Sequence, residues 1–288
     1  MVNYKSIKLS PGLYFVSTPI GSARDITLRA LDILANADVL AAEDTRTLKK
    51  LLEIHEIPMK NRILISYHDH NGSKARPKLL AHLEQGKSIA YASEAGTPLI
   101  ADPGFSLLTG VISAENNVTS APGPCALIAA LTVGGLPTDR FCFEGFLPNN
   151  KSQRELKFRQ LQSYRGTLIF YESAKRLKDT LVKALEIFGE TRQAVVCREI
   201  TKKFEDIKRG NLKELSAFYS DKNVKGEIVL LIAGAVDSDT DQSKIEQYVK
   251  DALRSMSVKD SAEAVALAFN VPRRDVYQIA LKIKSDGD

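Results

Sequence analysis

The chain has 288 residues, of which 44% are hydrophobic and 26% are charged, and both shares are close to those of ordinary globular proteins. This length corresponds to about two domains of roughly 150 residues each, and the composition excludes a disordered chain, a fibrous repeat and a small disulfide-stabilised scaffold. The formal net charge of +5 is only a weak sign of an anionic partner.

The charge is distributed unevenly along the chain. Residues 1–147 carry 14 basic and 14 acidic side chains, and residues 148–225 carry 18 basic and 10 acidic ones. The remaining residues, 226–288, carry 8 basic and 11 acidic side chains. The excess of positive charge therefore lies in one middle block, which we take as a candidate surface for a polyanion.

Nothing in the sequence predicts export or a membrane span. The N-terminal residues contain no apolar segment of signal-peptide length. The longest apolar stretch, Cys125–Leu136, is shorter than the roughly 20 residues that a bilayer requires. The three cysteines are odd in number and include no CxxC pair, so neither a disulfide framework nor a zinc site is predicted. We expect a protein of the reducing cytoplasm that does not associate with membranes.

Residues 1–122 alternate short apolar runs with amphipathic stretches. The apolar runs predict strands at Leu13–Ser17, Asp38–Ala42, Ile63–Ser66, Ser88–Ser93 and Asn117–Ala121. Helices are predicted between them, at Thr27–Ala35, Thr45–His55 and Lys74–Gln85. This alternation predicts an α/β domain with a largely parallel sheet, in which ligands bind at the carboxyl ends of the strands.

Residues 123–236 predict a second α/β domain whose sheet is mixed. Its strands are expected at Phe141–Phe146, Thr167–Tyr171, Ala194–Ile200, Phe204–Arg209 and Glu227–Ala233. Only Thr201–Lys203 separate the third strand from the fourth, and a gap of that length favours an antiparallel hairpin. The acidic segment Asp237–Ser243 resembles a linker, and a helical tail follows it. We therefore predict that residues 237–288 form a linker and a separate helical unit.

Three glycine- and proline-rich loops follow predicted strands of the first domain. They are Thr18–Asp25, the pair Ser93–Pro98 and Ala101–Gly104, and Ala121–Ala126. Loops of this kind bring backbone N–H groups close to a ligand, although each can also be an ordinary turn. None contains G-x-G-x-x-G or a P-loop lysine, so neither a dinucleotide-binding fold nor an NTPase is indicated.

Charged side chains gather where predicted strands end. Glu43 and Asp44 can act as bases, whereas Asp44 can equally cap the helix that begins at Thr45. In the second domain, Phe170–Arg176 and Cys197–Lys203 each combine acidic and basic residues, which can also form ordinary surface salt bridges. His68 and His70 have no further ligand at metal-like spacing, so no metal is expected.

The C-terminal tail predicts two helices joined by a short turn. The first covers Ser261–Phe269, and the second begins at Pro272 and carries Arg273 and Arg274 near its start. This arrangement resembles a helix-turn-helix, which would place the arginines on nucleic acid. A small helical cap without a nucleic-acid partner is the alternative.

Taken together, the motifs resemble the tetrapyrrole-methylase superfamily over nearly the full chain. They read S-T-P-I-G-S-A-R-D-I-T-L-R-A-L, A-A-E-D-T-R, S-E-A-G-T-P-L-I-A-D-P-G, F-E-G-F-L-P, F-Y-E-S and R-E-I-T-K-K-F-E. The E-D-T-R and R-E-I-T-K runs are similar to those of the subfamily that methylates the ribose 2′-hydroxyl of a decoding-centre cytidine in 16S rRNA. The resemblance implies a two-domain homodimer that holds S-adenosyl-L-methionine between its domains and acts on 16S rRNA or the small ribosomal subunit.

The resemblance also implies which residues hold the cofactor, and the glycine turns extend that set. The set comprises Ile20, Gly21, Glu94, Gly96, Thr97, Pro98, Gly123, Cys125, Ala126, Glu172, Ile200 and Glu227. Five positions depart from the family pattern: Glu94 replaces an aspartate, Ala174 a proline, Lys175 a histidine, Cys125 a serine and Ser22 an asparagine. No turn glycine is lost, so cofactor binding is still expected.

Methyl transfer to a ribose hydroxyl calls for a base, or for a cation that steadies the developing alkoxide. We expect Glu43 or Asp44 to be the base, with Arg46, Arg198 and Lys202 on phosphate or alkoxide. The residues expected to contact RNA are Lys151, Arg154, Lys157, Lys175, Arg176, Arg273 and Arg274. Two other functions stay open: methylation of a porphyrin or corrin, and RNA binding in ribosome assembly without catalysis.

Overall fold

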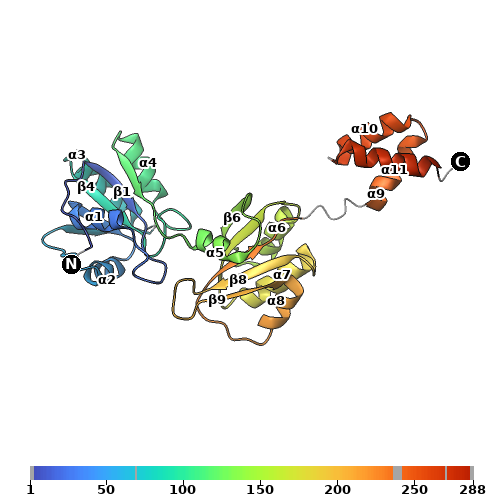
Figure 1. Ribbon diagram of the computed structural model, residues 1–288. Coiled ribbons are helices and arrows are strands. Elements are labelled where there is room, and N and C mark those ends of the chain that lie inside the picture. The colour runs from blue at the N-terminus through green and yellow to red at the C-terminus, as the bar shows by residue number, and fades with distance from the viewer. Residues whose placement is uncertain (1–2, 69, 236–241, 270, 286–288) are drawn as a thin grey trace. The chain divides into compact units, whose positions relative to one another are not determined.

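The computed structural model describes residues 3–68, 70–235, 242–269 and 271–285 (Figure 1). The chain divides into two compact units, Met1–Gly234 and Ala235–Asp288. The first unit contains two five-stranded sheets, and the second contains helices. Most of the predicted linker and the turn residue Asn270 lie outside the described residues.

The first sheet is entirely parallel, with strand order β3-β2-β4-β1-β5. Its strands are β1 (Gly12–Val16), β2 (Val39–Ala42), β3 (Ile63–Ser66), β4 (Ser88–Ala92) and β5 (Val118–Ala121). Every residue of β2 and β4 is buried, as expected of inner strands that are covered on both faces. Because all five strands run the same way, the loops after them meet at one edge of the sheet.

Helices cover both faces of the first sheet. The helices of this part are α1 (Leu28–Asn36), α2 (Thr45–Ile54), α3 (Gly72–Glu84) and α4 (Phe105–Ser113). Alternate strand residues point to opposite faces, so Leu40 and Ala42 pack with α1 and α2, whereas Val39 and Ala41 pack with α3 and α4. The result is a sheet held between two hydrophobic cores, with its loops fixed at each end.

The second sheet is mixed, with strand order β6-β7-β10-β8-β9. Its strands are β6 (Phe141–Phe146), β7 (Thr167–Ser173), β8 (Gln193–Arg198), β9 (Asp206–Asn211) and β10 (Glu227–Ile232). Strands β6 and β7 pair in parallel, whereas the pairs β7–β10, β10–β8 and β8–β9 are antiparallel. The hairpin predicted from the short gap after Ile200 is therefore confirmed as β8–β9.

Four helices pack on the second sheet, three on one face and one on the other. They are α6 (Lys151–Leu161), α7 (Leu177–Phe188), α8 (Leu212–Tyr219) and, on the opposite face, α5 (Ala126–Gly134). Helix α5 follows the last strand of the first sheet directly and contacts β7, β8, β9 and β10 (Figure 1). The chain thus passes from one sheet to the other through the Ala121–Ala126 loop.

The second compact unit contains three helices that share one small core. They are α9 (Gln242–Leu253), α10 (Val258–Phe269) and α11 (Arg273–Ser285). Val249, Ala262 and Ala280, one from each helix, are fully buried in that core. The predicted helix pair is present as α10 and α11, and α9 completes the bundle.

The predicted architecture is confirmed: a parallel sheet, a mixed sheet and a helical tail follow one another along the chain. The boundary predicted at residues 122 and 123 stays a prediction, and the strand membership of the two sheets supports it. Among the described residues, no helix has both the length and the apolar character needed to cross a membrane.

Candidate functional site

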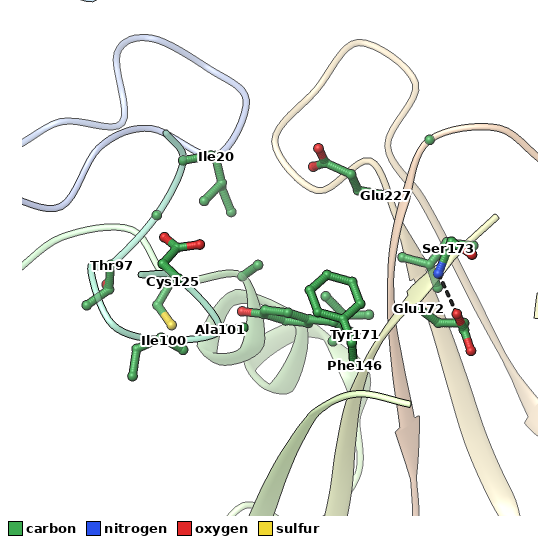
Figure 2. Close-up of a pocket in the computed structure, with 17 residues that line it drawn as sticks. Ile20, Thr97, Ile100, Ala101, Cys125, Phe146, Tyr171, Glu172, Ser173 and Glu227 are labelled. Carbon is green, nitrogen blue, oxygen red and sulfur yellow. Dashed lines mark hydrogen bonds between the residues drawn. The ribbon is translucent and has the colours of Figure 1, made fainter. Parts of the chain in front are cut away.

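A cavity of about 330 Å³ lies between the loop edge of the first sheet and the second sheet (Figure 2). That volume is within the range of small-molecule sites, roughly 300–1,000 Å³. Its lining residues are Ile20, Ala95, Gly96, Thr97, Ile100, Ala101, Asp102, Cys125, Ala126, Phe146, Tyr171, Glu172, Ser173, Gly226, Glu227, Ile228 and Val229. They come from the loops after β1, β4 and β5, from the first residue of α5, from β6, β7 and β10, and from Gly226 just before β10.

The first wall is built by two loops that hydrogen-bond to each other. Thr18, after β1, forms an antiparallel bridge with Gly96, after β4, with N···O distances of 2.9 and 3.0 Å. The Ser93 hydroxyl donates to the Gly96 carbonyl at 2.9 Å, which closes the turn from inside. Gly96 has φ +86°, a conformation that favours glycine, and a Cβ atom there would lie 3.3 Å from Ile20.

Thr97 ties this wall to the start of α5. Its hydroxyl donates to the Pro124 carbonyl at 2.9 Å and accepts from the Ser17 hydroxyl at 3.3 Å. Cys125 is the N-cap of α5, and its side chain makes no capping hydrogen bond. Cys125 and Ala126, the first residue of α5, both line the cavity (Figure 2).

Two aromatic rings occupy the middle of the site. The rings of Phe146 and Tyr171 pack edge to face, with centroids 5.5 Å apart (Figure 2). Burial raises the pKa of the Tyr171 hydroxyl, and the neighbouring Cys125 and Asp102 raise it further. Tyr171 is therefore a neutral hydrogen-bonding group at physiological pH, next to an apolar surface on which a flat ring can stack.

Glu172 lines the second wall, but its carboxylate is already hydrogen-bonded within the protein. That carboxylate is 0% exposed and accepts hydrogen bonds from Ser173 N, Thr180 Oγ1 and Arg176 Nε at 2.6, 2.7 and 2.8 Å. Buried charge is tolerated where paired donors replace water in this way. What Glu172 can offer a ligand is its backbone, which is what the resemblance implied.

The wall near β10 is joined to the first domain by the loop after β8. Lys202 Nζ binds Glu227 Oε2 at 2.8 Å and Glu199 Oε1 at 3.2 Å. The backbone N–H of Ser22 donates to Thr201 Oγ1 at 3.1 Å. Gly21 permits this contact, because a Cβ atom there would lie 2.5 Å from that hydroxyl. This hydrogen bond thus connects the loop after β1, which carries the cavity-lining Ile20, to the loop after β8.

The structure brings most of the predicted cofactor residues together. Seven of them line the cavity: Ile20, Gly96, Thr97, Cys125, Ala126, Glu172 and Glu227. The other five do not line it: Gly21, Glu94, Pro98 and Gly123 lie in the same loops, and Ile200 lies in the loop after β8. Pro98 is buried, Glu94 is exposed to solvent, and Ile200 packs against the core beneath α5.

The two acids after β2, Glu43 and Asp44, have different environments. Asp44 caps α2 by accepting from Arg46 N at 2.7 Å, and Arg46 Nη2 binds it again at 2.6 Å. These bonds lower the pKa of Asp44 to about 2, which makes it a poor acceptor for a hydroxyl proton. Glu43 is half-buried and lies close enough to the cavity to affect Asp102.

The predicted cations are mostly engaged in ion pairs. Arg198 Nε lies 3.9 Å from Asp206 Oδ2, Lys151 Nζ lies 3.9 Å from Asp179 Oδ2, and Arg273 Nη2 lies 3.3 Å from Glu263 Oε2. Lys157 pairs with Glu144, and Arg176 with Glu172. Lys151, Lys175 and Arg274 are exposed and can still meet an anionic surface.

Arg154 lies inside the protein. It is 3% exposed, one turn before the buried Phe158 on the face of α6 that packs on the sheet. The prediction that Arg154 contacts RNA is therefore wrong, because its side chain is not accessible at the surface. The sequence shows four basic residues on α6 without revealing which of them faces inward.

Sequence reasoning missed ten of the seventeen lining residues, and the three among them with an aromatic or acidic side chain are Asp102, Phe146 and Tyr171. The motifs containing them had been singled out, as A-D-P-G, F-E-G-F-L-P and F-Y-E-S, without a role for these side chains. Asp102 differs from the other acids of the site, because burial raises its pKa to about 7 and the nearby Glu43 and Glu94 add to the effect. The sequence signal that could have identified Asp102 is an acidic residue shortly after the glycine turn at Gly96.

The lining suits a cofactor that is both flat and cationic. The rings of Phe146 and Tyr171 and the side chain of Ile20 offer apolar surface, and the turn at Gly96 presents backbone groups. Asp102 Oδ2 is buried and has no hydrogen-bond partner among the described residues. An adenosyl group and a sulfonium would satisfy these two features. Within the described ranges, no group of three His, Cys, Asp or Glu side chains could hold a metal ion.

Comparison with known proteins gives two family matches along the chain. Residues 12–216 match the Tetrapyrrole (Corrin/Porphyrin) Methylases, and residues 239–284 match the RsmI C-terminal HTH domain. The sequence is similar to proteins named Ribosomal RNA small subunit methyltransferase I. It is 40% identical to the one from Mesorhizobium japonicum, with 97% of this chain and 96% of that protein covered. It is 41% identical to the one from Escherichia coli O157:H7, with 98% and 99% covered.

Solved structures show the same fold at low sequence identity. A conserved hypothetical protein from Aeropyrum pernix has a TM-score of 0.60 and 16% identity, with 96% of this chain and 98% of that one covered. Uroporphyrin-III C-methyl transferase from Thermus thermophilus, complexed with S-adenyl homocysteine, has a TM-score of 0.54 and 17% identity, with 77% and 97% covered.

Proposed function

This chain belongs to the tetrapyrrole (corrin/porphyrin) methylase family and is an S-adenosylmethionine-dependent methyltransferase, and from that premise we propose that it methylates 16S ribosomal RNA. The acceptor we propose is the ribose 2′-hydroxyl of a decoding-centre cytidine. The observation that carries the proposal is identity of about 40% with the rRNA methyltransferases over nearly the whole of both chains.

The helical tail favours a large substrate over a porphyrin or corrin. The match to the RsmI C-terminal HTH domain covers all three tail helices. A helix pair with Arg273 and the exposed Arg274 at the start of α11 suits a nucleic-acid backbone. A small macrocycle would need no such unit, because it has no extended phosphate backbone for a helix pair to bind.

The cofactor would lie in the cavity, where it supplies the methyl group. Backbone groups at Gly96, Cys125 and Glu172 would hold its polar edges, and Ile20 and Phe146 would cover its adenine. The hydrogen bond between Ser22 and Thr201 joins loops of the two sheets, and the one between Thr97 and Pro124 ties the first wall to the start of α5. Such fixed positioning contributes to methyl transfer by aligning the acceptor oxygen with the methyl carbon.

The cations around the site would serve the RNA and the forming alkoxide. Arg46 is 90% exposed, beside the loop edge of the first sheet, where it can meet a phosphate. Lys202 and Arg198 are more enclosed and already paired with acids, so for them we propose a role in the site's electrostatics. Glu43 stays a candidate base and Asp44 a weaker one. We also propose a homodimer in the cytoplasm.

The proposal is tested on small ribosomal subunits from a strain that lacks the modification. The subunits are incubated with the protein and S-adenosylmethionine carrying a labelled methyl group, and the methylated nucleotide is then mapped. We expect one label on the ribose 2′-oxygen of a decoding-centre cytidine. A parallel reaction on uroporphyrinogen is expected to give no product.

Three results would contradict the proposal. Label on a base would contradict the ribose acceptor, and label on the porphyrin alone would favour the macrocycle enzyme. Binding of the subunit with no methylation would favour a role in assembly without catalysis. A calorimetric titration with S-adenosylmethionine shows in each case that the protein used binds its cofactor.

A further inference from the structure

Three carboxyl groups line the cavity, and they differ in what they are bound to. Glu172 accepts three hydrogen bonds, and Glu227 is paired with Lys202 at 2.8 Å. Asp102 has a buried oxygen, Oδ2, without any hydrogen-bond partner among the described residues. Of the three, Asp102 is thus the carboxyl that is both inside the site and able to accept a further proton.

The backbone around Asp102 is held in an unusual conformation. Leu99 and Ala101 have φ values of +73° and +60°, which non-glycine residues adopt only when the surrounding structure enforces them. The Tyr91 hydroxyl donates to the Pro103 carbonyl at 3.1 Å and fixes the far side of the loop to β4. Strain of this kind gathers at functional sites, where it positions a particular side chain.

The groups that face Asp102 explain its affinity for a proton. Burial comes first, and the carboxylates of Glu43, after β2, and Glu94, after β4, add negative charge. From the second sheet, the side chain facing it is the neutral Tyr171, which itself lies beside Cys125. Arg46 interacts with Glu94 but is hydrogen-bonded to Asp44. A base that binds a proton near neutral pH has the strength that general-base catalysis requires.

We propose that Asp102 is the catalytic base that takes the proton from the ribose 2′-hydroxyl. This inference rests on the proposed function. As the proton passes to the Asp102 carboxylate, the oxygen's electron pair forms the bond to the methyl carbon. The bond between sulfur and that carbon breaks at the same time, and its electron pair stays on the sulfur, which leaves as a neutral thioether.

The charge on the cofactor prepares Asp102 for this step. A cation next to a buried carboxyl favours the ionised form, so binding of S-adenosylmethionine should release protons near neutral pH. S-adenosylhomocysteine lacks the sulfonium charge and should release fewer. After transfer, Asp102 is protonated beside a neutral thioether, and a new cycle begins with the next cationic cofactor.

The test compares wild type with Asp102→Asn and with a control, Asp139→Asn. Asp139 is exposed at the amino end of β6, whereas the carboxyl end of that strand carries Phe146. We expect Asp102→Asn to lower kcat by about 10²–10⁴-fold, with KM for the small subunit and Kd for the cofactor changed less than tenfold. The fall in kcat toward acidic pH, where Asp102 binds its proton, should disappear in Asp102→Asn.

Calorimetry in two buffers of different ionisation enthalpy counts the protons released as the cofactor binds at pH 7. We expect release by wild type and Asp139→Asn, and none by Asp102→Asn. A wild-type kcat in Asp102→Asn would overturn the base assignment and leave the proposed function intact. Loss of cofactor binding in that variant would have the same consequence. Absence of ribose methylation by the wild type would instead overturn the proposed function, and the base assignment with it.

Discussion

The two walls of the cavity use the same kind of side chain in opposite ways. The wall from the first sheet carries Asp102 with an oxygen that has no partner in the described part of the chain. The wall from the second sheet carries Glu172 and Glu227, whose carboxylates are bound to Arg176 and Lys202. The carboxylates of the second wall are thus paired within the protein, whereas the first wall has a carboxyl oxygen that can still accept a hydrogen bond or a proton.

The difference follows from how each wall is supported. On the second wall, Arg176, the N-cap of α7, lies next to Glu172, and Lys202, in the loop after β8, lies next to Glu227. On the first wall, parallel strands end together, so the acids Glu43, Glu94 and Asp102 lie close to one another, and Asp102 shows the effect in its raised pKa. Like charges gathered at one edge weaken stability and leave a carboxyl that binds protons near neutral pH.

The largest effect on stability is expected from Glu172→Ala. This change removes the acceptor of three hydrogen bonds and leaves the Arg176 guanidinium without its buried partner. We expect the free energy of unfolding to fall by about 3 kcal/mol, measured in urea. The matched control is Glu227→Ala, whose side chain is 78% exposed, and it should cost less than about 1 kcal/mol. Equal losses in both variants would contradict the distinction between buried and exposed pairs.

A smaller and more local effect is expected from Gly96→Ala. The substitution strains a backbone at φ +86° and places a methyl group 3.3 Å from Ile20, at a cost of about 1–3 kcal/mol. Because the cavity wall must shift, cofactor affinity should fall about tenfold, which corresponds to about 1.4 kcal/mol.

Gly86→Ala is the control for this change, since Gly86 has φ +72° after α3 with nothing within 4 Å of the added Cβ. It should lose similar stability in urea and keep its cofactor affinity in calorimetry. Unchanged cofactor binding in Gly96→Ala would show that this turn does not contact the ligand.

The smallest effect is expected from Asp44→Asn, which keeps an oxygen to cap α2 but removes the charge. Because the folded-state pKa of Asp44 is lowered from 3.8 to about 2, its ionisation stabilises the fold above about pH 4. That contribution is lost as the pH falls through 2. In acid-unfolding curves, the variant should therefore lose less stability than the wild type between pH 4 and pH 2. An identical slope would show that the Arg46 pair does not persist in solution.

The sequence predicted the elements well where local pattern decides them. The strand at Phe141–Phe146 was predicted with its observed ends, and β8–β9 was predicted as a hairpin from a gap of three residues. Asp44 was correctly recognised as a possible helix cap. These features depend on neighbours along the chain, on strand alternation, turn length and capping chemistry, and such neighbours are visible in the sequence.

The roles of single charged residues were predicted less well. Arg154 and Lys151 belong to the same basic helix, and only packing on the second sheet turns one inward and leaves the other exposed. Asp102 was seen as part of a turn, whereas its raised pKa arises from burial and from the carboxylates of Glu43, after β2, and Glu94, after β4. Charges and walls that come from distant segments cannot be read from local spacing.

By itself, the sequence determined the order of strands and helices, the glycine turns and the family, because each of these depends on residues that are consecutive in the chain. The tertiary structure alone decided which acids are paired and which is left without a partner at the cavity. Pairing depends on distances between residues such as Glu172 and Thr180, or Glu227 and Lys202, which the sheets bring together. Electrostatic interactions and burial depend on those distances, so the chemistry of the site follows from the fold.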